Sequence, residues 1–124
     1  MPSQGLVLFA HGARDARWAD PFRAVAAHIA QRRPDLVVTL AFLEHLAPNL
    51  DEALRAQVEQ GARATRIVPL FFGRGGHLRE DFPAMLEAAR AGVPQLHVEV
   101  TQAAGESSVI QAALADFALA GLSP

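Results

Sequence analysis

The stretch from Ile67 to His77 reads Ile-Val-Pro-Leu-Phe-Phe-Gly-Arg-Gly-Gly-His and joins an apolar run to a glycine-rich turn and a histidine. The run predicts a strand buried on both faces, although Pro69 cannot donate a ladder hydrogen bond. The glycines let the backbone turn sharply or approach a ligand closely, and His77 stands just before a helical pattern. A histidine where a buried strand gives way to a loop lies where open α/β sheets bind their ligands.

A second stretch, Gly5-Leu-Val-Leu-Phe-Ala-His11-Gly12, has the same form and also ends on a histidine. A third apolar run ends on Glu44-His45, and a fourth alternates Leu96, Val98 and Val100 with polar residues, which is typical of an edge strand covered on one side. The sequence therefore predicts four strands, at Leu6–Ala10, Leu36–Leu43, Arg66–Phe72 and Leu96–Thr101.

Helical patterns follow each of these strands. Asp20 with Pro21 predicts a capped helix start, Asn49 with Glu52 resembles a capping box, and Gly61 suits a helix C-terminus. The last helix is expected to bury Val109, Ile110, Ala113, Leu114 and Phe117. The predicted helices run from about Asp20 to Arg32, from Asn49 to Gly61, from Asp81 to Gly92, and onward from Ser107 or Ser108.

The alternation predicts an α/β domain with a four-stranded parallel sheet, helices on both faces and right-handed crossovers. The chain has 124 residues and a hydrophobic fraction of 51%, which suits one domain over residues 1–124. The net charge of −2 argues against nucleic-acid binding. The short first apolar run, with no basic side chain before it, predicts neither a membrane span nor a leader, and hence a cytoplasmic protein.

The chain contains no cysteine, so a metal ion would be bound by imidazole, carboxylate or water. Such ligands suit cobalt, nickel, iron and zinc better than soft copper(I). Because the carboxyl ends of parallel strands share one edge of the sheet, that edge would collect His11, Glu44 with His45, the loop from Gly73 to His77, and Thr101-Gln102.

Imidazole can hold a metal ion or accept a proton near neutral pH, which makes His11 and His77 the primary site candidates. Glu44 would be a third ligand or a base. If the strand pleat continues through Glu44, His45 points to the opposite face, and only one of the two side chains enters the site. The remaining histidines, His28 and His97, are expected to lie on the surface or to be structural.

The loop Gly73-Arg-Gly-Gly is neither a dinucleotide fingerprint nor a P-loop, so no nucleotide is expected. Gly75 and Gly76 would leave room for a flat ligand. The arginines around the two histidines, with their planar guanidinium groups, suit substrate carboxylates. These arginines are Arg14 and Arg17 after His11, and Arg74 and Arg79 beside His77.

Three stretches carry a family pattern: Leu8-Phe-Ala-His-Gly-Ala-Arg-Asp15, Phe42-Leu-Glu44 with Pro48, and Val68-Pro-Leu-Phe-Phe-Gly73 running into Gly75-Gly-His-Leu-Arg-Glu-Asp-Phe-Pro83. Together they closely resemble the class II tetrapyrrole chelatases. The nearest form is the small, single-domain sirohydrochlorin cobaltochelatase, a flavodoxin-like chelatase half-domain. The similarity extends to about Arg90.

This resemblance implies an ATP-independent enzyme of cobalamin or siroheme biosynthesis that inserts Co²⁺, or alternatively Fe²⁺ or Ni²⁺, into sirohydrochlorin. It assigns metal binding and help with pyrrole deprotonation to His11 and His77, with Glu44 as a helper. It also implies a homodimer, because one rim offers only one wall to a large flat ligand. Phe72, Leu78 and Leu46 would contact the apolar macrocycle.

Two alternatives remain open. The segment Thr101-Gln-Ala-Ala-Gly105 departs from the family pattern, which leaves room for a carrier that binds metal or tetrapyrrole without joining them. A phosphate-handling enzyme is disfavoured, because Ala10 precedes His11 where phosphohistidine-forming phosphatases have arginine, and because the P-loop is absent.

Overall fold

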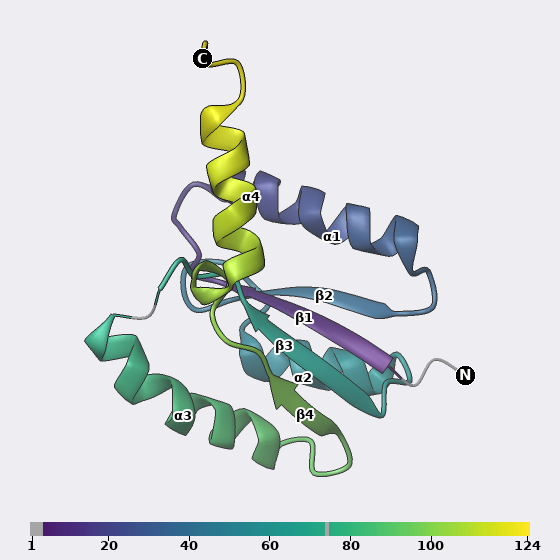
Figure 1. The fold of residues 1–124 in the computed structure, drawn as a ribbon. Coiled ribbons are helices and arrows are strands. Elements are labelled where there is room, and N and C mark those ends of the chain that lie inside the picture. The colour runs from purple at the N-terminus through teal and green to yellow at the C-terminus, as the bar shows by residue number, and fades with distance from the viewer. Residues whose placement is uncertain (1–3, 74) are drawn as a thin grey trace.

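A computed structural model describes residues 4–73 and 75–124, and within residues 76–79 it describes the backbone alone. The described residues form four strands and four α-helices in strict alternation, with two short 3-10 helices between them (Figure 1). The elements are β1 (Gln4–Ala10), η1 (Ala16–Ala19), α1 (Asp20–Arg32), β2 (Val37–Phe42), α2 (Leu50–Glu59), β3 (Ala64–Pro69), α3 (Gly76–Ala91), β4 (His97–Val100), η2 (Ala104–Glu106) and α4 (Ser108–Leu119).

The strands make one parallel sheet in the order β2-β1-β3-β4, which confirms the predicted α/β architecture and places β4 at an edge. Phe9 of the central strand β1 is paired with Ala41 on one side and Pro69 on the other. Pro69 is the last residue of β3, so the strand ends earlier than the predicted Phe72. This end position suits a residue that cannot donate a ladder hydrogen bond.

The larger core lies between the sheet and helices α2 and α3. Val7 and Phe9 of β1 are fully buried there against Leu54 of α2 and Phe82 of α3. The predicted capping box starts α2, since Asn49 Oδ1 accepts from the Glu52 amide at 2.8 Å and Glu52 Oε1 accepts from the Asn49 amide at 2.9 Å. Both helices use the apolar faces that their spacing predicts.

The opposite face of the sheet carries α1 and a smaller core. Ala10 and Phe42 pack there with Ala19, and the ring centroids of Trp18 and Phe22 lie 4.7 Å apart. Helix α1 has the predicted bounds, but no residue of it is buried.

The predicted cap of α1 was wrong. Ala19 is the N-cap and already has helical backbone angles, because η1 runs directly into α1. Asp20 is therefore the first helical residue, and its carboxylate pairs with Arg23 at 2.9 Å instead of capping the helix. A side-chain cap needs an extended residue before the helix, and this junction has none.

Helix α3 also begins earlier than predicted. It starts at Gly76, after an extended Gly75, so Asp81 lies in the second turn and Pro83 lies inside the helix. The sequence prediction placed Pro83 in the first turn, where a proline removes no helical hydrogen bond. His77 consequently belongs to the first turn of α3 rather than to the loop.

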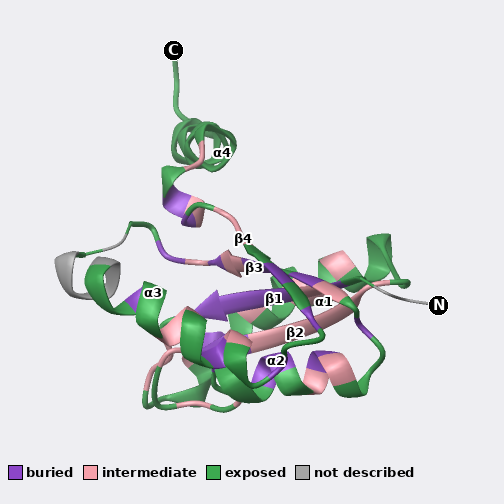
Figure 2. Cartoon of the chain, turned by 90° about the horizontal axis from the view of Figure 1, so that it is seen from below, coloured by how far each residue is buried: buried purple, intermediate pink, exposed green. Residues whose placement is uncertain are grey.

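The prediction that α4 buries an apolar face was wrong. Every residue of α4 is exposed, and the helix projects away from the body of the domain (Figures 1 and 2). Residues 107–119 pack against little beyond η2 at the helix base. None of the helices in the described ranges is long and apolar enough to cross a membrane.

Candidate metal and tetrapyrrole site

The carboxyl ends of the four strands lie along one edge of the sheet, as the topology predicts (Figure 1). His11 follows β1 directly, Glu44 stands two residues beyond β2, and Thr101 follows β4. The segment from Leu70 to Gly73 leaves β3 at the same edge. The predicted site residues that the structure describes therefore come from separate strand ends to one rim.

His11 is exposed to solvent but lies against a buried aromatic cluster. Its ring centroid is 4.5 Å from that of Phe71, which is only 2% exposed. Phe71 in turn contacts Phe9 edge-on at 5.6 Å, and Phe9 stacks with Phe82 at 5.8 Å. The imidazole thus rests on side chains continuous with the main core, which limits its orientations while the residue stays exposed. Sequence reasoning missed this support, although Phe71 belongs to the quoted apolar stretch.

The backbone holds His11 and Glu44 side by side. The Glu44 amide donates to the His11 carbonyl at 3.0 Å, and the Leu43 amide donates to the Ala10 carbonyl at 2.9 Å. These bonds continue the pairing of β1 with β2 past the strand ends. Gly12 makes this approach possible, since it has a φ of +93° and any β-carbon there would collide with the Glu44 carbonyl oxygen. Only glycine adopts that geometry without strain.

Glu44 and His45 lie on the same side of the rim. The His45 backbone has a φ of +68°, so the strand pleat does not continue through this pair. His45 Nε2 comes to 3.7 Å from Glu44 Oε1, and both side chains are exposed. The expected separation of the two side chains onto opposite faces therefore does not occur, because β2 already ends at Phe42. The rim gains a second imidazole beside the carboxylate.

The glycine loop borders open space. A β-carbon on Gly73 or on Gly75 would meet none of the described atoms within 4 Å, so the described part of the fold does not require glycine at either position. Phe72, next to Gly73, is 72% exposed, so its ring is available for contact with the apolar face of a ligand. Arg74 lies outside the described residues. Gly76, His77 and Arg79 belong to the first turn of α3, where the side chains lie outside the described part.

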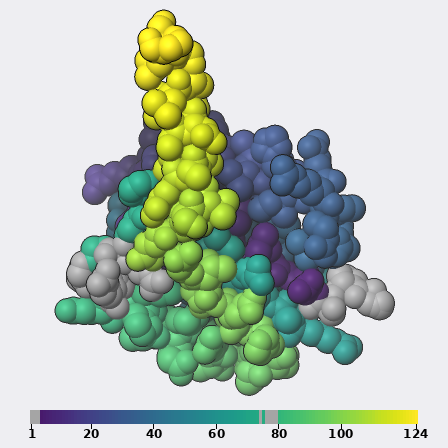
Figure 3. Space-filling view, in the orientation of Figure 1, coloured from purple at the N-terminus to yellow at the C-terminus, as the bar shows by residue number. Residues whose placement is uncertain are grey.

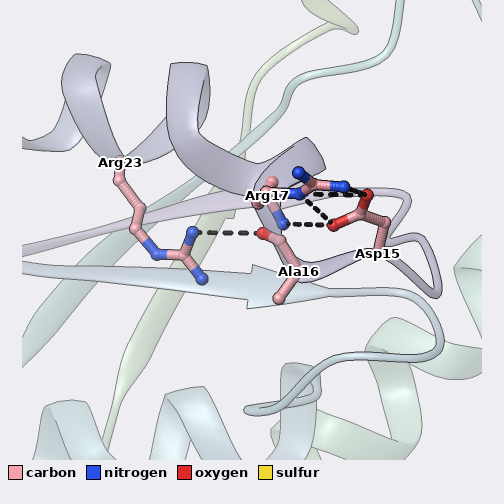
Figure 4. A network of polar contacts seen from close by, with 4 residues as sticks. All are labelled: Asp15, Ala16, Arg17 and Arg23. Atoms are coloured by element: carbon pink, nitrogen blue, oxygen red, sulfur yellow. Dashed lines mark hydrogen bonds and ion pairs between the residues drawn. The ribbon is translucent and has the colours of Figure 1, made fainter.

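The arginines after His11 differ in their engagement. Arg17 forms a bidentate pair with Asp15, with Nη2–Oδ2 at 2.8 Å and Nε–Oδ1 at 3.1 Å (Figure 4). This pairing lowers the pKa of the Asp15 carboxyl and raises the pKa of Arg17. Arg14 is exposed and forms an ion pair with none of the described side chains. It is thus the arginine on this side of the rim that is available to an anionic ligand.

Among the described side chains, no three histidines or acidic residues stand close enough together to hold a metal ion by themselves. The described rim supplies the His11 imidazole and the Glu44–His45 pair, all open to solvent. Such an incomplete ligand set suits an ion that must be passed on, whereas a closed structural site would retain it.

The family model described as CbiX matches residues 5–118. The chain belongs to the CbiX family. A sirohydrochlorin cobaltochelatase of Methanosarcina acetivorans is 28% identical to this CbiX-family chain over 95 residues, which cover 77% of this chain and 73% of that protein. The crystal structure of a CbiX protein from Marinobacter aquaeolei matches with 30% identity and a TM-score of 0.81, covering 93% of each chain.

The structure of SirB from Bacillus subtilis with Fe³⁺ has the same fold, with a TM-score of 0.77 and 21% identity. The match covers 98% of this CbiX-family chain but only 48% of SirB, so the chain spans about half the length of that protein.

Proposed function

We propose that this CbiX-family chain inserts a divalent metal ion into sirohydrochlorin without ATP, with Co²⁺ as the metal used preferentially. The observation that carries the proposal is the rim where Gly12 holds His11 beside Glu44, at the carboxyl edge of the sheet. The relative from Methanosarcina acetivorans, which the match covers over 73% of its length, is a sirohydrochlorin cobaltochelatase. Iron and nickel also suit imidazole and carboxylate ligands and are the alternative metals.

Metal insertion needs an ion that can shed water and a base for the two pyrrole N–H protons. In the proposed reaction the metal ion replaces these protons, and two protons leave for each ion inserted. His11 and His77 would bind the ion through the single lone pair of neutral imidazole, and after the ion has passed to the macrocycle the freed nitrogen would accept a pyrrole proton. The carboxylate of Glu44 would stabilise a protonated imidazole beside it, and Gly75 and Gly76 would leave room for the macrocycle.

The acidic periphery of sirohydrochlorin needs cationic partners, which Arg14, Arg74 and Arg79 would supply. Arg14 supports this role because it is exposed and forms no ion pair with the described side chains, whereas Arg17 is held by Asp15. Phe72 would lie against the apolar face of the macrocycle. Guanidinium groups bind carboxylates through two parallel hydrogen bonds, which would fix the ring orientation.

A single domain over residues 1–124 would act as a homodimer in the cytoplasm, because one rim forms only one wall of a pocket for a flat macrocycle. The match to half of SirB supports a second copy as the other wall. A homodimer would place two rims around one substrate.

The test is an absorbance assay in which sirohydrochlorin and Co²⁺ are mixed with the protein at a small fraction of the substrate concentration. The assay is then repeated with Fe²⁺ and with Ni²⁺ in place of Co²⁺. The proposal expects a spectral change that proceeds well beyond one equivalent per site. A change that stops at one equivalent would establish a carrier instead. No acceleration with any of the three metals would overturn the proposed reaction.

A further inference from the structure

Two consecutive phenylalanines at the rim have opposite surroundings. Phe71 is only 2% exposed and its ring lies against His11, whereas Phe72 is 72% exposed. The two side chains thus point to opposite sides of the segment that continues β3, as in a strand, and a slip by one residue would exchange them. The support of His11 and the ring available to the macrocycle therefore both depend on how the backbone of this segment is held.

Backbone hydrogen bonds hold the segment from two sides. On the side of β1, the Leu70 amide donates to the Phe9 carbonyl at 2.7 Å. On the other side, the Gly105 amide donates to the Phe71 carbonyl at 2.9 Å. Gly105 belongs to η2, and in the space-filling view this yellow-green part of the chain lies against the teal residues that follow β3 (Figure 3). The segment after β3 is therefore fixed between β1 and η2.

Gly105 comes this close because it has no side chain. It is buried, and a β-carbon on it would collide with the carbonyl group and the α-carbon of Phe72. Its φ lies outside the left-handed region, so the close approach, and not its own backbone conformation, is what requires glycine here. Any larger residue at position 105 would displace the backbone of Phe72.

Further contacts fix η2 itself. The Gln111 amide group donates to the Gly105 carbonyl at 3.1 Å, so both backbone polar groups of Gly105 have partners. Glu106 Oε1 accepts from the Ala103 amide at 3.1 Å, and Ala103 is fully buried in the main core. Because η2 is anchored to the core in this way, it presents Gly105 to the Phe71 carbonyl at a defined place.

We propose that Gly105 is a positioning residue for metal insertion, which keeps the Phe71 ring against His11 and the Phe72 ring turned toward the macrocycle. The inference rests on the proposed function and adds to it a residue that acts through two others. Gly105→Ala would displace the Phe72 backbone and with it the Phe71 ring. Since a misplacement of about 1 Å can cost about 100-fold in rate, kcat is expected to fall at least about tenfold and KM for sirohydrochlorin to rise.

The first measurement needs no turnover and records the place of the Phe71 ring. The NMR shifts of the His11 imidazole protons report the ring current of Phe71, whose centroid lies 4.5 Å away. Gly105→Ala is expected to change these shifts. Gly5→Ala is the matched control, because its β-carbon collides with Gln57 at the other end of β1 and destabilises the fold away from the rim. Unchanged His11 shifts in Gly105→Ala, or an equal change in Gly5→Ala, would overturn the proposal.

The second measurement is the rate of insertion in a double-mutant cycle. Phe71→Leu keeps an apolar side chain in the core but removes the ring that contacts His11. If Gly105 acts through Phe71, then Gly105→Ala should lower kcat much less in the Phe71→Leu background than in the wild-type chain. Two independent losses, which multiply in the double variant, would contradict the proposal.

If Gly105→Ala does not fold, Gln111→Ala decides, because it removes only the hydrogen bond that an exposed residue donates to the Gly105 carbonyl. It is expected to change the His11 shifts in the same sense by a smaller amount, and unchanged shifts would overturn the proposal. A wild-type chain that inserts no metal, but whose His11 shifts respond to Gly105→Ala, would refute the proposed reaction and leave the positioning of His11 by Gly105 standing.

Discussion

Gly12 lies against the backbone of Glu44 so closely that the Glu44 carbonyl oxygen occupies the place of a β-carbon on Gly12. The amide of Glu44 also donates to the carbonyl of His11 at 3.0 Å. The position of the candidate catalytic histidine relative to the candidate carboxylate is thus set by a glycine that itself contributes no functional group.

Gly12→Ala should consequently disturb both the fold and the site. A residue with a β-carbon is strained at a φ of +93°, and the collision adds to this, so we expect a loss of roughly 1–3 kcal/mol in the free energy of unfolding. The rate of metal insertion should fall by more than the loss of folded protein accounts for, because the β-carbon would push the His11 loop away from Glu44. Urea unfolding and the insertion assay measure the two effects.

Gly73→Ala is the matched control for Gly12→Ala. A β-carbon there meets none of the described atoms within 4 Å and φ lies outside the left-handed region, so stability should change by less than about 0.5 kcal/mol. If the two variants lose the same stability, the close approach of Gly12 and Glu44 is not what constrains the rim.

Much of the rim could be predicted from sequence, because strand ends carry a strong signal. The apolar runs before His11 and Glu44 predict buried parallel strands, and the topology alone then gathers their ends at one edge. The relation between Glu44 and His45 could not be predicted. It depends on a positive φ at His45, and a positive φ is uncommon for any residue other than glycine, even for histidine, which is enriched there.

The error at α4 has a different cause. Apolar spacing at Ile110, Leu114 and Phe117 predicts that these side chains will be buried, but it does not say against which surface. The start of α3 could not be predicted, because a proline usually marks the first turn of a helix. Pro83 instead lies well inside α3.

A buried polar network under the sheet supports a second prediction. The side chain of Gln57, fully buried on α2, donates to the Val37 carbonyl at 2.8 Å and to Thr39 Oγ1 at 2.9 Å, and accepts from Thr65 Oγ1 at 2.8 Å. Gln57→Ala should lower the free energy of unfolding by roughly 2–4 kcal/mol, because several buried polar atoms lose their partners. Urea unfolding measures the loss.

Gly5 provides the internal control for this network. A β-carbon on Gly5 would collide with Gln57 Oε1, so Gly5→Ala should destabilise the wild-type chain yet cost much less in the Gln57→Ala background. The double-mutant cycle is therefore expected to show coupling of at least about 1 kcal/mol. Additive losses would mean that the two residues do not compete for the same space.

The ion pair of Asp15 with Arg17 is expected to persist to lower pH than the ordinary pKa of an aspartate would allow. The hydrogen bond from Arg17 lowers the pKa of the Asp15 carboxyl from the usual 3.8. The contribution of this carboxylate to the stability of the fold is therefore present above about pH 4 and is lost as pH falls through the lowered pKa. Arg17→Ala should raise the Asp15 pKa in an NMR titration. Arg33→Ala is the matched control, since it should raise the pKa of Asp35 and leave Asp15 unchanged.

Replacement of the rim histidines separates a catalytic role from a structural one. His11→Ala and His77→Ala should each lower the rate of metal insertion by at least about 100-fold, since each would remove a metal ligand and a proton acceptor. Because His11 is exposed and its ring lies on Phe71 rather than in the core, its replacement should change stability by less than about 0.5 kcal/mol. His28→Ala and His97→Ala remove the same side chain from exposed positions away from the rim and should retain wild-type rates. If His11→Ala and both controls keep full activity, His11 takes no part in the reaction. The Glu44–His45 pair would then be the remaining described candidate at this rim.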